Sequence, residues 1–351
     1  MIVAHVDLDA FFATVEELEQ PELRTKPLVV GGDPRGRGVV ATANYAARRF
    51  GIQSAMRCAE ALRRCPQTVF LRPRHQHYRQ ISREVWAAIR EVAPVVEQTG
   101  IDEGYLDLTP QAADFLEARK LAEAVQTAVR GTTRLTCSLG VAPSKVVAKI
   151  ASDRRKPGGV TVVPEGREAA FLAPLDVRRL PGVGPRAEAR LRSAGVETIG
   201  ALARLTNAEL AALLPGKVGD MLRTRAWGID PRSVEPVAEP PVSISHEETF
   251  ERDVDDRAKL HEELRRMAES LGRGLHERGL FSRTVTTKLR YGDFTTRTRS
   301  ETMAAGTDDP QRVADLACAL LDRALDERPG ALRLVGVAVS TLQPVAQLAF
   351  V

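Results

Sequence analysis

The sequence predicts an α+β protein built from several domains, and three observations carry this prediction. Helical and strand-like patterns alternate along the first 165 residues, whereas residues 166–230 contain short helical patterns only. Residues 231–243 hold four prolines, which is typical of a linker, and precede a second region of alternating strands and helices. The length of 351 residues allows two to four domains of ordinary size.

The composition excludes several classes of protein. Hydrophobic residues make up 43% of the chain and charged residues 27%, which is typical of globular proteins in water. No apolar run approaches the roughly 20 residues of a membrane span, and the start MIVAHVDLDAFF lacks the features of a signal peptide. The four cysteines have no C-x-x-C spacing, which argues for a reducing compartment and against a zinc knuckle. We therefore expect a cytoplasmic protein with no membrane partner.

The first region has the order of elements expected for a sheet covered by helices. We expect a strand at 2–6, a helix at 11–20, strands at 27–32 and 38–43, and a helix that begins at Asn44 as its cap. A helix at 77–93, strands at 95–101 and 104–109, a helix at 114–130, a strand at 135–141 and a helix at 144–156 follow.

The last region has a similar mixture of elements. We expect a strand from residue 246, a helix at 255–278, strands at 284–291 and 294–302, a helix at 310–327 and a strand at 332–341. Gly292 and Asp293 lie between the two neighbouring strands and predict a hairpin turn. This region is expected to form a separate α+β domain.

Two acidic motifs about a hundred residues apart suggest a metal site. Asp7 ends an apolar strand, and Asp102 and Glu103 lie where two strands meet in a hairpin. Adjacent residues of a flat strand face opposite sides, so both acids reach one pocket only at a turn or bulge. With the backbone carbonyl of Leu8, these carboxylates would form an oxygen-rich site for Mg²⁺. Two such ions, roughly 3.5–4 Å apart, are the usual device for in-line phosphoryl transfer.

Within this scheme we expect Asp102 to bridge both ions and Glu103 to serve mainly the ion near the nucleophile. Taken singly, each of these acids could also be an ordinary surface carboxylate. Asp9 is expected to cap or salt-bridge the helix that it starts, and Asp107 is expected to point to the face opposite the site.

Phe11 and Phe12 directly follow the first acidic motif. An aromatic plate against a nucleotide sugar leaves no room for a 2′-hydroxyl, so such a pair would select deoxyribose. The alternative is that both are ordinary core aromatics, which is the usual meaning of two adjacent phenylalanines.

Four polar side chains are candidates for binding a triphosphate. Thr42, Tyr45 and Arg48 have helical spacing, and Arg48 could donate to two phosphate oxygens at once. Lys156 lies at the end of the predicted helix 144–156, where a lysine often only compensates the helix dipole. The alternative for the first three is a polar surface helix.

The string LPGVGPRAEARLRSAGV at 180–196 predicts a helix-hairpin-helix. Gly182 and Gly184 open a helix whose free N–H groups can bind a phosphate without reading base sequence, and Arg186 follows them. Residues 213–222 are a fainter second copy. The alternative is a plain glycine-containing turn.

A basic hairpin at 284–299 is a second candidate for contact with nucleic acid. Lys288 and Arg290 share one face of the first strand, and Arg297 and Arg299 share one face of the second. A basic stripe on a sheet can track a phosphate backbone. A charged face exposed to solvent is the alternative.

Six motifs in the same order resemble the Y-family DNA polymerases, and their DinB branch most of all. They are HVDLDAFFATVE, VATANYAARRFGIQSAM, TGIDEGYLDLT, SLGVAPSKVVAKIASDRRKPGG, LPGVG and KLRYGDFTTRTRS. The resemblance runs from residue 1 to about 342.

The resemblance implies a right-hand polymerase. A ferredoxin-like palm would comprise 1–10 and 77–165, small fingers 11–76, an all-α thumb 166–230, a linker 231–243, an α+β little finger 244–345 and a tail 346–351. The implied activity is low-fidelity, template-directed addition of dNTPs to a primer 3′-hydroxyl in translesion synthesis. The implied partners are primer–template DNA, dNTPs and two Mg²⁺ ions, with Mn²⁺ as a substitute, and the enzyme is expected to be a monomer.

By the same resemblance, each motif residue takes a role. Asp7, Asp102 and Glu103 would hold the metals, Phe12 would be the steric gate, and Thr42, Tyr45, Arg48 and Lys156 would contact the triphosphate. Ala10 is smaller than the residue of some relatives, and Arg57 replaces a frequent proline. The end QLAFV, Gln347–Val351, is an imperfect copy of a sliding-clamp peptide.

Two other classes of protein compete with this interpretation. A DNA-binding accessory protein with the same fold would be expected to lack one of the three acids, yet all are present. A nucleotide cyclase also uses paired carboxylates on an α+β palm, but it needs neither the helix-hairpin-helix nor the basic hairpin.

Overall fold

The computed structural model describes residues 1–214, 216–237 and 239–344. The chain divides into two compact units. One unit comprises residues 1–34 and 38–238, and the other comprises residues 35–37 and those from Glu239 onward.

A five-stranded sheet forms the centre of the first unit, with strand order β5-β6-β1-β7-β8. Its strands are β1 (Val3–Leu8), β5 (Val96–Gln98), β6 (Glu103–Asp107), β7 (Cys137–Ala142) and β8 (Val160–Val162). Strand β1 is central and pairs antiparallel with β6 and β7, whereas β8 runs parallel to β7. A central β1 explains why its sequence is apolar on both faces.

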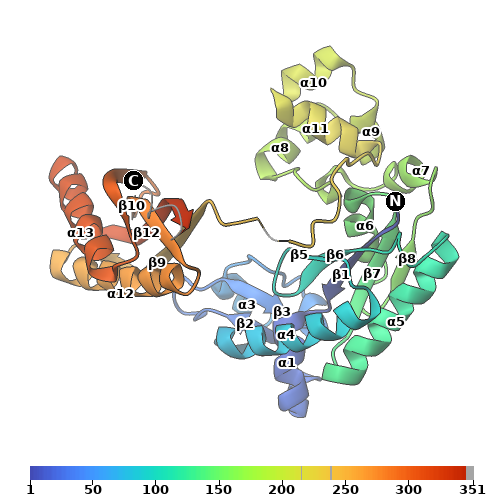
Figure 1. Ribbon diagram of the computed structural model, residues 1–351, viewed down its shortest axis with the longest axis horizontal. Helices are drawn as coiled ribbons and strands as arrows, with labels where there is room; N and C mark the ends of the chain where they lie inside the picture. Colours follow the sequence, from blue (N-terminus) through green and yellow to red (C-terminus); the bar gives the residue numbers. More distant parts are fainter. Residues whose placement is uncertain (215, 238, 345–351) are drawn as a thin grey trace. The chain divides into compact units, whose positions relative to one another are not determined.

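Helices cover both faces of this sheet. Helices α4 (His75–Val92) and α5 (Phe115–Thr133) share one core with alternate residues of β1, and Figure 1 shows them on one side of the sheet. Helix α6 (Lys145–Ser152) packs on the opposite face. The order β1, α4, β5, β6, α5, β7 is the ferredoxin-like βαββαβ arrangement.

A glycine sets the distance between α6 and the sheet. A Cβ atom at Gly140 of β7 would lie 2.0 Å from the carbonyl oxygen of Ala148 and 2.4 Å from the amide nitrogen of Ser152. Since both atoms are helix backbone, only a residue without a side chain allows α6 to pack this closely.

A three-stranded sheet with order β3-β2-β4 lies between α1 and α4 in the sequence. Its elements are α1 (Phe11–Glu19), the 3₁₀ turn Pro21–Leu23, β2 (Leu28–Gly31), β3 (Val40–Ala43), α2 (Tyr45–Arg48), α3 (Cys58–Arg64) and β4 (Val69–Leu71). The predicted cap is confirmed, because the side chain of Asn44 accepts a hydrogen bond of 2.8 Å from the amide of Ala47. Thr42 lies in β3, so the helical spacing predicted for Thr42, Tyr45 and Arg48 is wrong.

The stretch predicted to be helical is confirmed. It contains α7 (Glu168–Leu172), the 3₁₀ turn Val177–Arg179, α8 (Pro185–Ser193), α9 (Ile199–Ala203), α10 (Asn207–Leu213) and α11 (Lys217–Ala226). These elements share a core with α6. The first part of the predicted linker also packs here: Val234 is buried in that core, and the amide of Glu235 donates to Oε2 of Glu97 at 2.7 Å.

The second unit is a four-stranded antiparallel sheet with order β11-β10-β12-β9. Its elements are β9 (Ser243–Val254), α12 (Arg257–His276), β10 (Leu280–Tyr291), β11 (Thr296–Thr307), α13 (Pro310–Glu327) and β12 (Leu332–Pro344). Both helices pack on one face of the sheet around a single core. The order of strands and helices predicted for this region is confirmed.

The hairpin between β10 and β11 differs from the prediction by one residue. The amide of Tyr291 donates to the carbonyl oxygen of Thr295 at 2.9 Å, and Phe294 adopts a left-handed conformation with φ of 66°. The loop therefore has three residues, a type I turn followed by a left-handed residue, in place of the two-residue Gly-Asp turn.

Among the described residues, none of the helices is long and apolar enough to span a bilayer. Cys58, Cys65, Cys137 and Cys318 are buried free thiols.

Candidate active site and nucleic-acid interface

The two acidic motifs meet at the end of β1. In the antiparallel pairing of β1 with β6, Asp7 lies opposite Glu103. The amide of Leu8 donates to the carbonyl oxygen of Asp102 at 2.9 Å, which fixes the bend that precedes β6 against the end of β1. Asp102 lies in that bend and Glu103 begins the strand, so the two neighbours are not forced to opposite faces. This is the turn that the sequence analysis required if both acids are to reach one pocket.

The pKa values of these acids reflect their crowding. Burial, followed by the charges of Asp7 and Glu103, raises the pKa of Asp102 to about 6. Burial also raises the pKa of Asp7, against the lowering effect of Lys156. Glu103 differs, because a hydrogen bond from His5, together with Lys149, lowers its pKa to about 2.

Lys156 neutralises Asp7. Its ammonium group lies 2.7 Å from Oδ1 of Asp7 and 2.8 Å from Oδ1 of Asp153. Although burial alone would lower the pKa of Lys156, the two carboxylates raise it, so the side chain stays charged. Lys156 follows α6 rather than ending it, since the helix stops at Ser152.

Glu103 is held by two side chains that the sequence analysis did not single out for the site. Nζ of Lys149 lies 2.5 Å from Oε2 of Glu103, and Nε2 of His5 lies 3.5 Å from the same oxygen. The other ring nitrogen of His5 is 2.8 Å from the hydroxyl of Ser152. A signal was available for His5, which lies two residues before Asp7 and so on the same face of β1.

The acids suit a divalent cation, although lysines now pair with two of them. Within the described ranges, no three His, Cys, Asp or Glu side chains are arranged to hold a metal as they stand. Burial is the main cause of the raised pKa values of Asp7 and Asp102, because it disfavours their charged forms, and a bound divalent cation would stabilise those forms. Hard carboxylate oxygens are also the ligands that Mg²⁺ prefers.

The two acids set aside in the sequence analysis do not behave as predicted. Asp9 neither caps nor salt-bridges α1, because the cap position is Ala10, in a left-handed conformation with φ of 47°. Its carboxylate instead accepts hydrogen bonds from Ser138 and the amide of Gly158. Asp107 lies on the same face of β6 as Glu103, four residues further along, so distance (about 13 Å along the strand), not orientation, excludes it from the site.

Phe11 and Phe12 have different environments. The side chain of Phe11 is only 1% exposed and belongs to the core, so it has no access to a nucleotide, contrary to the prediction. Phe12 is half-buried, and its ring stacks on Tyr78 with centroids 4.2 Å apart and an interplanar angle of 16°. Only Phe12 can therefore present a ring face or edge to a ligand.

Tyr45 and Arg48 lie on α2, three residues apart. The phenol oxygen of Tyr45 is 3.5 Å from Oδ1 of Asp9, and burial, followed by the charge of Asp9, raises the pKa of Tyr45 to about 12. The guanidinium of Arg48 lies over the Tyr45 ring, 4.8 Å from its centroid, and donates to the carbonyl oxygen of Ala43. Thr42 precedes both of them in the chain, on β3.

The helix-hairpin-helix residues have the expected local structure. Gly184 is the N-cap of α8, and Gly182 has a φ of 106°, a conformation that favours glycine. Arg186 is exposed in the first turn of α8. In the fainter copy, Gly216 has a φ of 76° and precedes α11 in the same way.

The basic residues of the hairpin lie on opposite faces of the sheet, so the single stripe suggested by the sequence is wrong. Leu289, a core residue, pairs with Arg297, whereas Lys288 pairs with Thr298. Arg297 and Arg299 are thus on the helix side, where both form ion pairs with Glu327 of α13.

The open face of that sheet is polar and rich in hydroxyl groups. It carries Lys288 and Arg290 together with Thr284, Thr286, Thr296, Thr298, Ser300 and Thr302. Cross-strand hydrogen bonds join Thr286 to Ser300 at 2.8 Å and Arg290 to Thr296 at 3.0 Å. Lys288 is paired with Glu247 on β9 at 2.7 Å.

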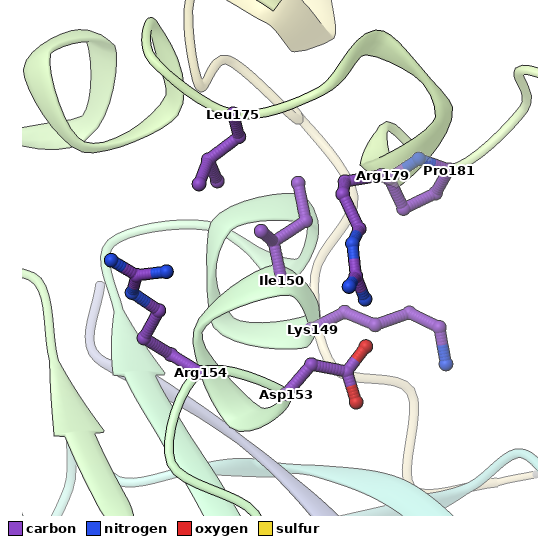
Figure 2. Close-up of a pocket in the computed structure, with 7 residues that line it drawn as sticks. All are labelled: Lys149, Ile150, Asp153, Arg154, Leu175, Arg179 and Pro181. Atoms are coloured by element: carbon purple, nitrogen blue, oxygen red, sulfur yellow. The ribbon is translucent and has the colours of Figure 1, made fainter. Parts of the chain in front are cut away.

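A cavity of about 250 Å³ lies beside the acids, between α6 and the chain that leads into the helical region. It is lined by Lys149, Ile150, Asp153, Arg154, Leu175, Arg179 and Pro181. Figure 2 shows the guanidinium of Arg179 close to the Lys149 side chain, whereas that of Arg154 points away on the other side of Ile150. The cavity does not include Asp7, Asp102 or Glu103, so it is a neighbour of the acidic site and not the site itself.

Comparison with known protein families identifies the class. Residues 6–153 match the impB/mucB/samB family, residues 241–349 match the C-terminal domain of that family, and residues 178–230 match the thumb domain of DNA polymerase iota. The chain belongs to the impB/mucB/samB family of Y-family DNA polymerases and is a DNA-directed DNA polymerase.

The relatives similar to this chain are DNA polymerases IV. It is 44% identical over 349 residues to that of Streptomyces coelicolor, covering 98% of this chain and 72% of the relative. It is 43% identical over 345 residues to that of Methanoculleus marisnigri, covering 97% and 94%. The predicted family and the predicted DNA-directed DNA polymerase activity are confirmed, and the cyclase alternative is excluded.

Solved structures agree with this assignment. A Y-family DNA polymerase chimera of Dbh and Dpo4 aligns with a TM-score of 0.87 at 26% identity, covering 98% of this chain and 100% of that chain. DinB from Sulfolobus solfataricus aligns with a TM-score of 0.67 at 26% identity, covering 97% and 98%. The predicted right-hand polymerase fold with a ferredoxin-like palm is confirmed.

Proposed function

We propose that this polymerase extends a primer by two-metal-ion transfer, with Asp7, Asp102 and Glu103 as the metal ligands. The observation that carries the proposal is the convergence of these acids at the end of β1, in a protein of a polymerase family. The backbone carbonyl of Leu8 would add a further hard oxygen ligand. When bound, a divalent cation supplies charge neutralisation and lowers the pKa of a coordinated hydroxyl.

The residues of the chain prepare this site for its cations. Lys156 now neutralises Asp7 and also pairs with Asp153, so it can leave Asp7 without losing its only carboxylate partner. Lys149 and His5 fix the carboxylate of Glu103 and keep it ionised. Mg²⁺ is the ion we expect, with Mn²⁺ as a substitute, and Asp102 is the ligand that we expect to bridge both ions.

Nucleotide binding is assigned to side chains around the acids. Tyr45, Arg48 and Lys156 would donate to the triphosphate, with Thr42 at the edge of β3. The ring of Phe12, backed by Tyr78, would exclude a ribose 2′-hydroxyl. Solved structures of Dbh DNA polymerase described as binary and insertion ternary complexes are similar to this chain, which supports dNTP and primer–template DNA as ligands.

The DNA grip is proposed to come from two surfaces. Gly182, Gly184 and Arg186 would bind the backbone through free amides and one guanidinium at the start of α8. Lys288 and Arg290 would do so from the open, hydroxyl-rich face of the second sheet. We accordingly propose palm (1–10 and 77–165), fingers (11–76), thumb (166–230) and little finger (244–345).

Low fidelity and lesion bypass are proposed from the small residues near the nucleotide. Ala10 lies beside the Phe12 gate, and Ser54 and Ala55 lie in the turn after α2, where Ala55 has a φ of 67°. Small side chains leave loose walls around the nascent base pair, and loose walls discriminate weakly between correct and incorrect pairs. The enzyme would act as a cytoplasmic monomer. The predicted clamp-binding segment Gln347–Val351 lies outside the described residues.

Primer extension with an Asp102→Ala variant tests the proposal. We expect loss of at least roughly a thousandfold in rate, because removing a ligand to both ions removes transition-state charge stabilisation. Asp107→Ala is the matched control, since it removes a carboxylate from the same face of the same strand. Extension by the Asp102→Ala variant at the control rate would refute the metal assignment.

A further inference from the structure

Asp9 is a buried carboxylate that the reaction as proposed does not use. Asp9 as a whole residue is only 2% exposed. Among the described residues, its carboxylate accepts hydrogen bonds from neutral donors and not from a lysine, arginine or histidine. Burying a carboxylate is costly unless donors satisfy it. The identity of those donors therefore indicates what Asp9 does.

The first two donors come from opposite sides of the carboxylate. The hydroxyl of Ser138 on β7 donates to Oδ1 at 2.7 Å, and the backbone amide of Gly158 donates to Oδ2 at 2.8 Å. Gly158 lies two residues after Lys156, in the loop between α6 and β8. Hydrogen bonds to a charged acceptor are roughly twice as strong as neutral ones. Asp9 thus fixes the loop that carries Lys156.

The third donor links Asp9 to the nucleotide-binding helix. The phenol of Tyr45 lies 3.5 Å from Oδ1 of Asp9, at the outer limit of a hydrogen bond. The pKa of Tyr45 is raised to about 12, first by burial and then by the charge of Asp9, so the phenol stays protonated and can donate.

Asp9 is itself fixed at its backbone. Its amide donates to the carbonyl oxygen of Thr136 at 2.9 Å, and its carbonyl oxygen accepts from the hydroxyl of Thr14 at 2.7 Å. One residue after β1 is therefore joined to β7, to α1, to the Lys156 loop and to α2.

We propose that Asp9 is a positioning residue for nucleotide binding: it holds the Lys156 loop and the Tyr45 hydroxyl where the triphosphate needs them. This inference rests on the proposed function, because it assumes that Lys156 and Tyr45 contact the triphosphate. Asp9 acts through these residues, touching neither the substrate nor the metal ions.

The test measures dNTP binding and catalysis separately in primer extension. Asp9→Ala is expected to raise the KM for dNTP about tenfold, the value of one charge-assisted hydrogen bond, with kcat changed less than about threefold. Asp9→Asn keeps one acceptor oxygen, which can serve the Gly158 amide but not the Tyr45 hydroxyl as well, so its KM is expected to lie between that of the native enzyme and that of Asp9→Ala. The affinity for primer–template DNA, measured by fluorescence anisotropy, should not change.

Thr14→Val is the matched control. It removes one of the two hydrogen bonds to the backbone of Asp9 but leaves the bond from the Asp9 amide to Thr136, the carboxylate and its donors in place, so KM should not change. A KM shift in Thr14→Val as large as that of Asp9→Ala, or a KM for Asp9→Asn as high as that for Asp9→Ala, would overturn the proposal.

A double variant separates the inference from the function on which it rests. If Lys156→Ala leaves KM unchanged, the assigned triphosphate contact is wrong. If Lys156→Ala raises KM and Asp9→Ala does not, only the positioning role of Asp9 is wrong. When Asp9 acts through Lys156, Asp9→Ala should raise KM less in the Lys156→Ala background than in the native one, and fully additive effects would contradict this.

Amide hydrogen exchange of the unaltered protein provides a readout that needs no variant. The Gly158 amide lies in a loop, yet its bond to Asp9 should protect it more than the amide of Gly166 in the loop after β8, for which no hydrogen bond is found among the described residues. Equal exchange rates for the two amides would overturn the proposal even if Asp9→Ala failed to fold.

Discussion

The ammonium group of Lys156 lies 2.7 Å from Oδ1 of Asp7. Lys156 therefore supplies, next to Asp7, a positive charge of the kind that a bound metal ion would supply. Asp153 holds the same ammonium from the other side at 2.8 Å. In the proposed mechanism, Lys156 would exchange Asp7 for the triphosphate once a metal ion is bound. Replacing Lys156 should therefore change metal-ion binding and nucleotide binding in opposite directions.

Lys156→Ala should strengthen the binding of metal ions while weakening the binding of nucleotide. Loss of a positive charge beside Asp7 removes a competitor, so Mn²⁺ affinity without nucleotide should rise roughly tenfold. The KM for dNTP should also rise, because a phosphate donor is lost. Electron paramagnetic resonance of Mn²⁺ and primer extension measure the two effects. Lys120→Ala, on the exposed side of α5, is the control, and a fall in Mn²⁺ affinity would contradict the exchange.

Metal binding should depend on pH through Asp102. Its pKa is raised to about 6, first by burial and then by Asp7 and Glu103, so below that pH a proton competes with the cation. Half-maximal extension should require more Mg²⁺ as the pH falls through 6, by up to about tenfold per pH unit. Glu103, with its pKa lowered to about 2, stays ionised over this range. A Mg²⁺ requirement that is constant between pH 5.5 and 7.5 would show that Asp102 is not a ligand.

Sugar selection should depend on Phe12 and not on its neighbour. Phe12→Ala should lower the preference for dNTP over rNTP by roughly tenfold to a hundredfold, since it removes the ring that we propose excludes a 2′-hydroxyl. Phe11→Leu should cost roughly 1–2 kcal/mol of folding free energy, because Phe11 is core, without changing that preference. Single-nucleotide insertion and thermal unfolding measure the two. An altered sugar preference in Phe11→Leu would contradict the assignment.

DNA binding by the second sheet should depend on one face only. Replacing both Lys288 and Arg290 with Ala should weaken binding and reduce the slope of log K against log salt by about 1.8, the value for two phosphate contacts. Replacing Arg297 and Arg299 with Ala should leave the slope unchanged, because they pair with Glu327 on the helix side. Fluorescence anisotropy of labelled primer–template DNA, measured over a series of salt concentrations, gives this slope for both double variants. Equal effects of the two double variants would mean that the hairpin edge binds DNA from both sides.

The error over the hairpin has a simple physical origin. A two-residue turn at Gly292 and Asp293 would pair Lys288 with Arg297 and place all four cations on one face. The three-residue loop pairs Lys288 with Thr298, and a slip of one residue turns every side chain of a strand to the other face. Apolar periodicity predicts the two strands correctly. The length of the loop, however, depends on the left-handed conformation of Phe294, and no local sequence pattern predicts that conformation for a phenylalanine.

The convergence of the two acidic motifs could be predicted from the sequence, because the backbone alone decides it. The strand before Asp7 and the hairpin before Glu103 follow from local patterns, and β-pairing then brings the acids together. Asp9 was misassigned because an aspartate before a helix usually caps it, whereas the left-handed Ala10 turns the chain and sends Asp9 toward β7. Lys149 and Ser138 reach the site only through the packing of α6 and β7, which no local pattern encodes.

The close approach of α6 to the sheet depends on the absence of a side chain at position 140. Because Gly140 contributes no side chain, Ser152 and Lys149 come near enough to support His5 and Glu103. One added methyl group at this position would push the helix outward and loosen the acidic cluster while leaving every charged residue in place. A substitution that abolishes the activity of this enzyme therefore need not replace a residue that contacts the substrates.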